Sequence, residues 1–191
     1  LSISFFYWSK GFEVNSLEYL NNLLMISKNL DKTIFILANS LINHIKGKKK
    51  EAISYLEENQ KTFKEANNQI KKKYYQLLIN LYLLNNSYSD NLENYFKLLS
   101  GISDKYEVYH LVLKAMFMER LAKNKADYLN ALFLYEKAIN EGFKDTNIIF
   151  RAFFIHFVFG NTGKAKEYIK YLIEADSNDP VFLHYYKRLQ N

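Results

Sequence analysis

The chain has 191 residues, a net charge of +6 at pH 7, 49% hydrophobic residues, one proline and six glycines. This length fits one domain or one short repeat array, and the scarcity of proline and glycine argues against a β-sandwich or a disordered Pro/Gly-rich chain. The absence of cysteine excludes disulfides, thiolate metal sites and thiol catalysis. Basic residues are spread along the chain, so we attribute the abundant lysine, asparagine and isoleucine to AT-rich codon usage rather than to nucleic-acid binding.

The chain begins with Leu1 and not with methionine, and we expect it to be a trimmed fragment or a processed product. Residues 1–10 are apolar and aromatic but too short to cross a bilayer. They fit the end of a removed membrane helix, because Tyr7 and Trp8 precede Lys10 as at a membrane interface. They also fit a helix or strand that covers the open end of a helical array, which we favour. The sequence leaves an upstream membrane tether open.

Helical spacing of apolar residues continues through the rest of the chain. Asn15 and Glu18 have the spacing of a capping box, which predicts a helix to about residue 28. Asp31 is expected to cap the next helix, which ends at Gly47. A further helix is expected at residues 51–56, and a long helix is expected to begin at Thr62 or Asn67 and to end at residue 84. The remaining expected helices are 90–100, 104–121, 128–139, 147–159, 162–173 and 180–189. Asp179 is expected to cap the last of them. Apart from residues 3–7 no stretch suggests a strand, so we expect an all-α fold of about nine helices paired as antiparallel hairpins.

One residue pattern occurs twice between residues 126 and 180, with a period of about 34 residues. The matching pairs are Ala131 and Ala165, Tyr135 and Ile169, Ala138 and Leu172, and Ile139 and Ile173. Small and large apolar residues repeated at this period are typical of stacked helical hairpins. We expect an N-terminal flank at 1–14, irregular hairpins at 15–101, and regular repeats with a C-terminal capping helix at 102–191.

Residues 126–180 resemble the tetratricopeptide repeat family. Residues 160–165 look like the family's turn between its first and second helices, and residues 173–180 look like its exit turn, with Ser177 where proline is usual. Residues 135–142 also resemble the exit of a Sel1-like repeat, a related family. The resemblance implies a right-handed α-solenoid whose concave face, lined by first helices, binds peptides or partner proteins. It implies no catalysis.

The aromatic helix at residues 147–159 is the best candidate for a binding site. It is apolar on nearly every side, so it is either buried all round or lines a groove that awaits a partner. Burial accounts for most of its rings, but in a superhelix this face can receive an amphipathic helix or an apolar peptide. The residues expected to contact a partner are Phe150, Phe154, Phe157, Asn147, Arg120 and Met116.

Two lysine clusters suggest an alternative function. Lysines flank Gly47 at residues 46 and 48–50, and residues 71–73 are three lysines that precede Tyr74 and Tyr75. Such clusters fit the binding of anionic lipid or RNA, with tyrosine stacking beside phosphate contacts. They equally fit a solvated turn and the wet face of an amphipathic helix. Tyr74 belongs to the predicted core stripe, which favours the second interpretation.

No stretch carries a catalytic or metal-binding pattern. Residues 160–165 lack the spacing and the Ser/Thr of a phosphate-binding loop and are better explained as a turn between helices. The four histidines are scattered, and His156 is expected to be a hydrogen-bonded core residue. The acidic residues that lie on lysine-rich helix faces are expected to form solvated ion pairs: Glu57, Glu58, Glu136 and Glu141.

Together these patterns predict a non-catalytic protein–protein interaction scaffold without a cofactor or a metal ion. The expected partner is a protein or peptide bound on a concave helical surface, and the chain is expected to be part of a larger protein or assembly. Nucleic acid is the less favoured partner. A cytoplasmic location is favoured, while membrane association and self-association stay open.

Overall fold

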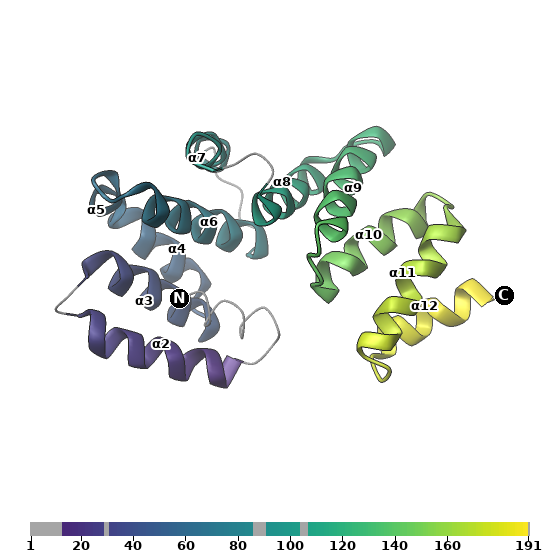
Figure 1. Cartoon of the computed structure of the whole chain (residues 1–191), viewed down its shortest axis with the longest axis horizontal. Helices are drawn as coiled ribbons and strands as arrows, with labels where there is room; N and C mark the ends of the chain where they lie inside the picture. Colours follow the sequence, from purple (N-terminus) through teal and green to yellow (C-terminus); the bar gives the residue numbers. More distant parts are fainter. Residues whose placement is uncertain (1–12, 29–30, 86–90, 104–106, 191) are drawn as a thin grey trace. The chain divides into compact units, whose positions relative to one another are not determined.

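The structure is a computed structural model, and it describes residues 13–28, 31–85, 91–103 and 107–190. Every regular element in these residues is a helix, which confirms the predicted all-α class (Figure 1). The chain divides into two compact units, Leu1–Lys105 and Tyr106–Asn191. The expectations for residues 1–10, and the expected helix starts at residues 90 and 104, lie outside the described residues. None of the described helices is both long and apolar enough to span a membrane.

The first unit, residues 1–105, contains six described helices. They are α2 (Glu13–Ser27), α3 (Lys32–Ile45), α4 (Lys49–Glu58), α5 (Gln60–Lys64), α6 (Asn68–Leu84) and α7 (Asn91–Ser100). The second unit contains α8 (Val108–Leu121), α9 (Lys125–Asn140), α10 (Thr146–Val158), α11 (Thr162–Ala175) and α12 (Pro180–Gln190). The described residues thus form more helices than the nine or so expected, and the short α5 is one that the sequence pattern did not separate from its neighbour.

Most helix starts follow local capping signals. The Asp31 carboxylate accepts hydrogen bonds from the backbone N–H groups of Thr33 and Ile34, at 2.8 and 3.2 Å. Asn67 caps α6 in the same way, and Pro180 is the first residue of α12, as predicted. The capping role expected for Asn15 is wrong, because α2 begins at Glu13 and Asn15 lies inside the helix.

Two helices of the second unit end in a left-handed glycine. Gly142 has φ of 93° and Gly160 has φ of 76°, a region in which a β-carbon would be strained. The residue after each glycine donates its N–H to a carbonyl one turn back in the helix, at 3.0 Å for Phe143 and 2.9 Å for Asn161. These bonds close the last turns of α9 and α10 and reverse the chain, which is why both helices lead into tight hairpins.

The core of the first unit forms where α4, α5 and α6 meet. Tyr74 is completely buried and stacks on Phe63, with 4.2 Å between the ring centroids. Its hydroxyl donates to the carbonyl of Leu56 at 3.3 Å, so the polar end of the ring is satisfied inside the core. The prediction that Tyr74 belongs to the core is confirmed. Ser40 on α3 similarly donates to the carbonyl of Ala52 on α4 at 2.7 Å.

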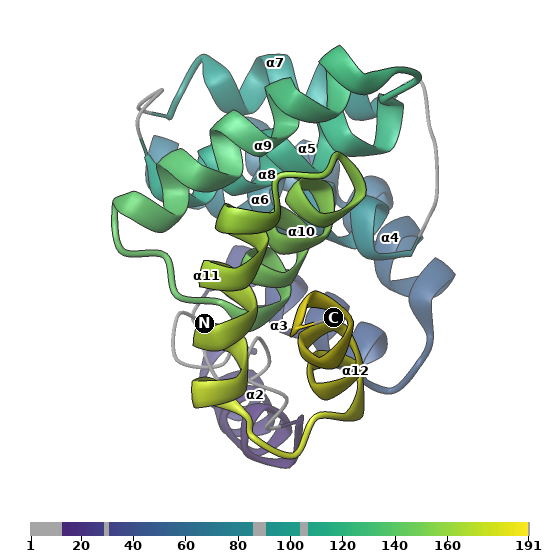
Figure 2. The ribbon, with the colours of Figure 1, turned by 90° about the vertical axis from the view of Figure 1, so that its right-hand side faces the viewer.

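In the second unit each helix packs against the next along the chain, from α8 to α12. The pair α11 and α12 lies side by side in both views (Figures 1 and 2). Three of the pairs that the repeat pattern matches are fully buried at both members: Ala131 and Ala165, Tyr135 and Ile169, and Ala138 and Leu172. α9 and α11 therefore use the same positions to contact their neighbours, which is the structural counterpart of the sequence repeat.

Candidate functional site

The predicted aromatic face of α10 is partly exposed. Phe154 has 41% of its surface exposed, while Phe150 and Phe157 are half-buried. Asn147 is exposed at the start of the same helix, one turn before Phe150 and Arg151. Five other apolar residues of α10 are buried in the unit: Ile148, Ile149, Ala152, Phe153 and Ile155. The helix is thus buried on most sides, as expected, and leaves a partly exposed aromatic stripe formed by Phe150, Phe154 and Phe157.

Tyr185 on α12 packs onto this stripe. Its ring centroid lies 5.9 Å from that of Phe150, 6.0 Å from Phe154 and 5.2 Å from Phe157. Phe182, one turn earlier on α12, lies 5.6 Å from Phe150. The edge-to-face geometry of the contacts with Phe154 and Phe157 is a favourable arrangement of aromatic rings. The sequence had shown Tyr185 only as part of an amphipathic helix, and its place among the phenylalanines depends on how the helices fold back.

Exposed apolar and basic side chains surround these rings. Val158 on α10 and Val181 on α12 are 55% and 47% exposed. The guanidinium of Arg188 lies 5.3 Å from the centre of the Phe157 ring, within reach of a cation–π interaction. We call the surface formed by Phe150, Phe154, Phe157, Val158, Val181 and Tyr185 the α10/α12 aromatic surface.

The two predicted contact residues on α8 lie in different surroundings. Met116 is buried, with 8% of its surface exposed, and so belongs to the core of the second unit. Arg120 is half-buried in the last turn of α8. The structure therefore brings together the three predicted phenylalanines, with Asn147 on the same helix, and places Met116 inside the unit.

Carboxylates between helices were missed by sequence reasoning. Glu57 on α4 accepts hydrogen bonds from the hydroxyls of Tyr82 and Tyr95, at 2.7 and 2.9 Å. Glu119 on α8 accepts from Tyr135 at 2.6 Å and from Arg151 at 2.8 Å. The expectation that Glu57 would be solvated is wrong, because its side chain lies half-buried between α4, α6 and α7.

A third carboxylate, Glu136 on α9, lies 3.1 Å from Nε2 of His156 and 3.5 Å from the hydroxyl of Tyr168. The His156 and Tyr168 rings stack, with 5.7 Å between centroids. The prediction of a hydrogen-bonded core histidine is therefore confirmed, and the solvated role predicted for Glu136 is wrong. The partners of these carboxylates come from other helices, so no local spacing could have revealed them.

The electrostatics of these carboxylate junctions follow from burial. Burial, and then the negative charge of Glu119, raises the pKa of Tyr135 above its ordinary value, although Arg151 opposes the rise. Burial, followed by the charges of Glu136 and Glu167, raises the pKa of Tyr168 to about 12. These tyrosines therefore stay protonated at neutral pH and act as hydrogen-bond donors that join helices, not as bases or nucleophiles.

The two lysine clusters differ in exposure. Residues 46 and 48 are exposed in the turn between α3 and α4, where Gly47 has φ of 78°. Residues 49 and 50 are exposed in the first turn of α4. Residues 71–73 are half-buried on α6. Within the described part of the chain, no three His, Asp or Glu side chains are grouped so that they could hold a metal ion.

Comparison with known proteins returned no match: no family model, no curated protein and no solved structure is significantly similar to this chain.

Proposed function

We propose that this chain is a non-catalytic protein-interaction scaffold, a tetratricopeptide-like α-solenoid of helical hairpins that binds a partner protein or peptide. Two observations in the second unit support the solenoid. Each helix packs against the next along the chain, and the repeat-matched residues of α9 and α11 are equally buried. Stacked hairpins of this kind present one helix of each pair on a continuous surface suited to binding an extended partner.

We infer that the partner binds on the α10/α12 aromatic surface. Phe154, Val158 and Val181 expose large apolar area beside rings that are already fixed by packing on Tyr185. Aromatic residues held rigid by their neighbours lose little conformational entropy on binding, which makes them effective anchors at protein interfaces.

The charges near this surface indicate the kind of partner. Lys187 and Arg188 are exposed in the last turn of α12, and Arg188 lies against Phe157. An amphipathic helix or apolar peptide with acidic residues beside its apolar anchors would complement both the rings and the cations.

Selection from a peptide display library tests this proposal directly. Wild-type protein is expected to enrich peptides with apolar residues at helical spacing and flanking acidic residues. These peptides should lose binding to the double variant Phe154→Glu, Val158→Glu, because both residues are exposed and the charges would sit in the contact surface. Both positions can be changed without opening the core, and circular dichroism verifies that the variant folds.

The matched control places the same charges on another exposed apolar pair of this unit. Phe133 on α9 is 65% exposed and Tyr171 on α11 is 37% exposed. Phe133→Glu with Tyr171→Glu should leave binding unchanged. Peptides that bind the α10 variant as well as wild type, or that are lost equally in the control, would contradict the proposed surface.

The exposure of residues 46 and 48–50 favours a second candidate function, attraction to an anionic surface. Vesicles containing phosphatidylserine should then bind the protein at low salt and release it steeply as salt rises. Replacing the lysines at positions 48–50 by glutamine should abolish this binding. Binding that ignores both salt and these substitutions would dismiss the candidate.

A further inference from the structure

A second candidate site lies elsewhere in the same unit. A pocket of about 240 Å³, open to solvent, lies between α9, α10 and the turn that leads into α11. Its lining residues are Lys125, Leu129, Leu132, Ile155, His156, Phe159 and Asn161. No residue of the α10/α12 aromatic surface is among them, so this site does not depend on the function proposed above.

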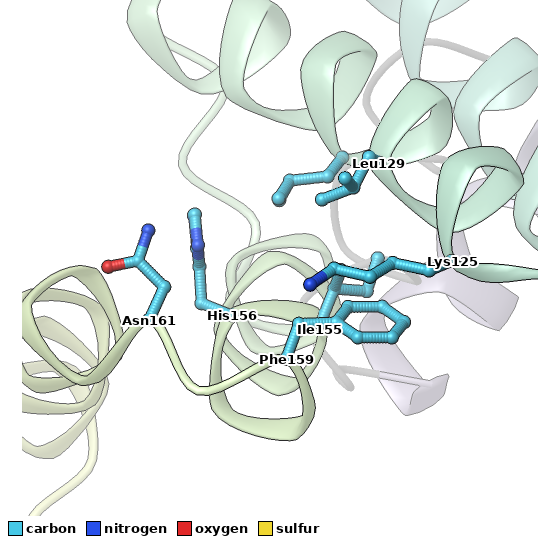
Figure 3. Close-up of a pocket in the computed structure, with 7 residues that line it drawn as sticks. Lys125, Leu129, Ile155, His156, Phe159 and Asn161 are labelled. Carbon is cyan, nitrogen blue, oxygen red and sulfur yellow. The ribbon is translucent and has the colours of Figure 1, made fainter.

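The pocket has an apolar floor and a polar rim. Leu132, Ile155 and His156 are buried, whereas Lys125 and Asn161 are exposed at the opening. In Figure 3 the Lys125 amine points from α9 toward the side of the pocket on which His156 and Asn161 lie. A ligand that enters would therefore meet leucine and isoleucine side chains below and polar side chains around its outer end.

Lys125 is the only charged residue among the seven that line the pocket. Its Nζ atom lies 5.3 Å from the centre of the Phe159 ring, so a cation–π contact helps to orient this exposed amine. Asn161 is the N-cap of α11, and its side chain lies where the positive end of that helix dipole begins.

A carboxylate that lies close to His156 is already engaged. Glu136 lies behind His156 and is bound by the His156 ring and by the Tyr168 hydroxyl. It is not one of the lining residues, so it does not neutralise Lys125 inside the pocket. The rim between Lys125 and Asn161 is thus the part of the site that favours a negative charge.

We propose that this pocket binds a carboxylate attached to a compact apolar group. The apolar group occupies the floor formed by Leu132 and Ile155, and the carboxylate lies between the Lys125 amine and the Asn161 side chain. An apolar cavity of about 150 Å³ holds benzene, so a pocket of about 240 Å³ has room for a ligand of roughly eight non-hydrogen atoms. A branched six-carbon acid has this size, and so has the last residue of a chain that ends in leucine with a free carboxylate.

Titration with 4-methylpentanoate, followed by ¹H–¹⁵N correlation spectra of the labelled protein, tests the proposal. Saturable shifts are expected at the pocket residues, with a Kd of about 0.1–10 mM for a ligand of this size. The uncharged 4-methylpentanamide should bind at least about tenfold more weakly. A short peptide that ends in leucine, with a free or an amidated C-terminus, distinguishes the two sources of the carboxylate. If the peptide with the free C-terminus binds and the amidated peptide does not, the site is assigned to a chain terminus. If 4-methylpentanoate binds and neither peptide does, the site is assigned to a small acid.

Two variants with matched controls locate the site. Lys125→Gln should weaken 4-methylpentanoate about tenfold, whereas Lys170→Gln, an equal change of charge at an exposed position of α11, should have no effect. Leu129→Trp should fill the pocket and remove binding, whereas Phe133→Trp, one turn away and outside the pocket, should not.

The proposal is overturned if wild type shows no saturable shifts with 4-methylpentanoate up to about 50 mM, which is well above the expected Kd. Equal affinity for the amide, or unchanged affinity in Lys125→Gln, would also overturn it.

Discussion

Glu57 in the first unit and Glu119 in the second each join three helices, but they do so with different donors. Glu57 is bound by two neutral hydroxyls, from Tyr82 and Tyr95, both of which belong to buried residues. Glu119 is bound by one hydroxyl, from Tyr135, and by the guanidinium of Arg151, whose side chain is 40% exposed. Each unit therefore uses a half-buried carboxylate to hold its helices in register, and in the second unit a cation, Arg151, is one of the donors.

The difference determines what happens when the carboxylate is lost. A buried hydroxyl that loses its acceptor keeps the full cost of desolvation, whereas a half-exposed guanidinium recovers water as a partner. The Glu57 junction should therefore be the more fragile of the two.

The largest expected effect is that of Glu57→Leu. The substitution removes the carboxylate that accepts from the Tyr82 and Tyr95 hydroxyls, and we expect it to lower the free energy of unfolding by about 2–4 kcal/mol. Urea denaturation followed by circular dichroism measures the loss. Adding Tyr82→Phe and Tyr95→Phe to this variant removes the stranded hydroxyls and should recover much of the stability. A triple variant no more stable than Glu57→Leu would show that the hydroxyls are not the cause.

Glu119→Leu should cost less, about 1–2 kcal/mol. It strands one buried hydroxyl, that of Tyr135, while Arg151 turns to solvent. Hydrogen exchange should show increased opening of α8, α9 and α10, the three helices that Glu119 joins. A loss larger than that of Glu57→Leu would reverse the comparison and would mean that the ion pair contributes more than its exposure suggests.

Alkaline pH tests the third junction, at Glu136. Because the folded protein raises the pKa of Tyr168 from 10.0 to about 12, the contribution of this tyrosine to stability is fully present below pH 10 and is lost as pH rises toward 12. We expect a loss of about 1 kcal/mol between pH 9 and pH 11 from this residue. Comparing urea denaturation of wild type and Tyr168→Phe at both pH values isolates it. An equally steep alkaline loss in the variant would assign the effect to other tyrosines.

Whether an interaction can be predicted from the sequence depends on how far apart its two residues lie along the chain. Asp31 and Asn67 act on N–H groups within three residues, so their capping roles are readable from local spacing. The pair Ala131 and Ala165 is readable because the repeat recurs at a fixed period. Glu57 receives its hydroxyls from residues 25 and 38 positions away, on helices that no repeat relates to it, so its lysine-rich neighbours suggested a solvated face.

The candidate sites show the same limit. Three phenylalanines on one face of α10 were visible as a helical stripe, whereas Tyr185 joins them only because α12 folds back. The pocket at Lys125 combines residues from two helices and a turn, and nothing in the chain before folding marks them as neighbours.

The smallest effects compare the helix caps of the two units. Asp31 accepts bonds from two backbone N–H groups and from the Thr33 hydroxyl. Among the described residues, Asp145 at the start of α10 accepts from the backbone N–H groups of Asn147 and Ile148. We expect Asp31→Ala to cost about 1 kcal/mol and Asp145→Ala about 0.5 kcal/mol, and Asp31→Asn, which keeps an acceptor, to cost less than Asp31→Ala.

The Thr33 hydroxyl and the backbone N–H groups of Ile34 and Thr33 lower the pKa of Asp31, although burial opposes this, so its contribution is present above pH 3.8 and is lost as pH falls further. Thermal unfolding at pH 7 and pH 3 should therefore separate wild type from Asp31→Ala at pH 7 and bring them closer at pH 3. A difference that persists unchanged at pH 3 would show that the carboxylate charge does not matter to the cap.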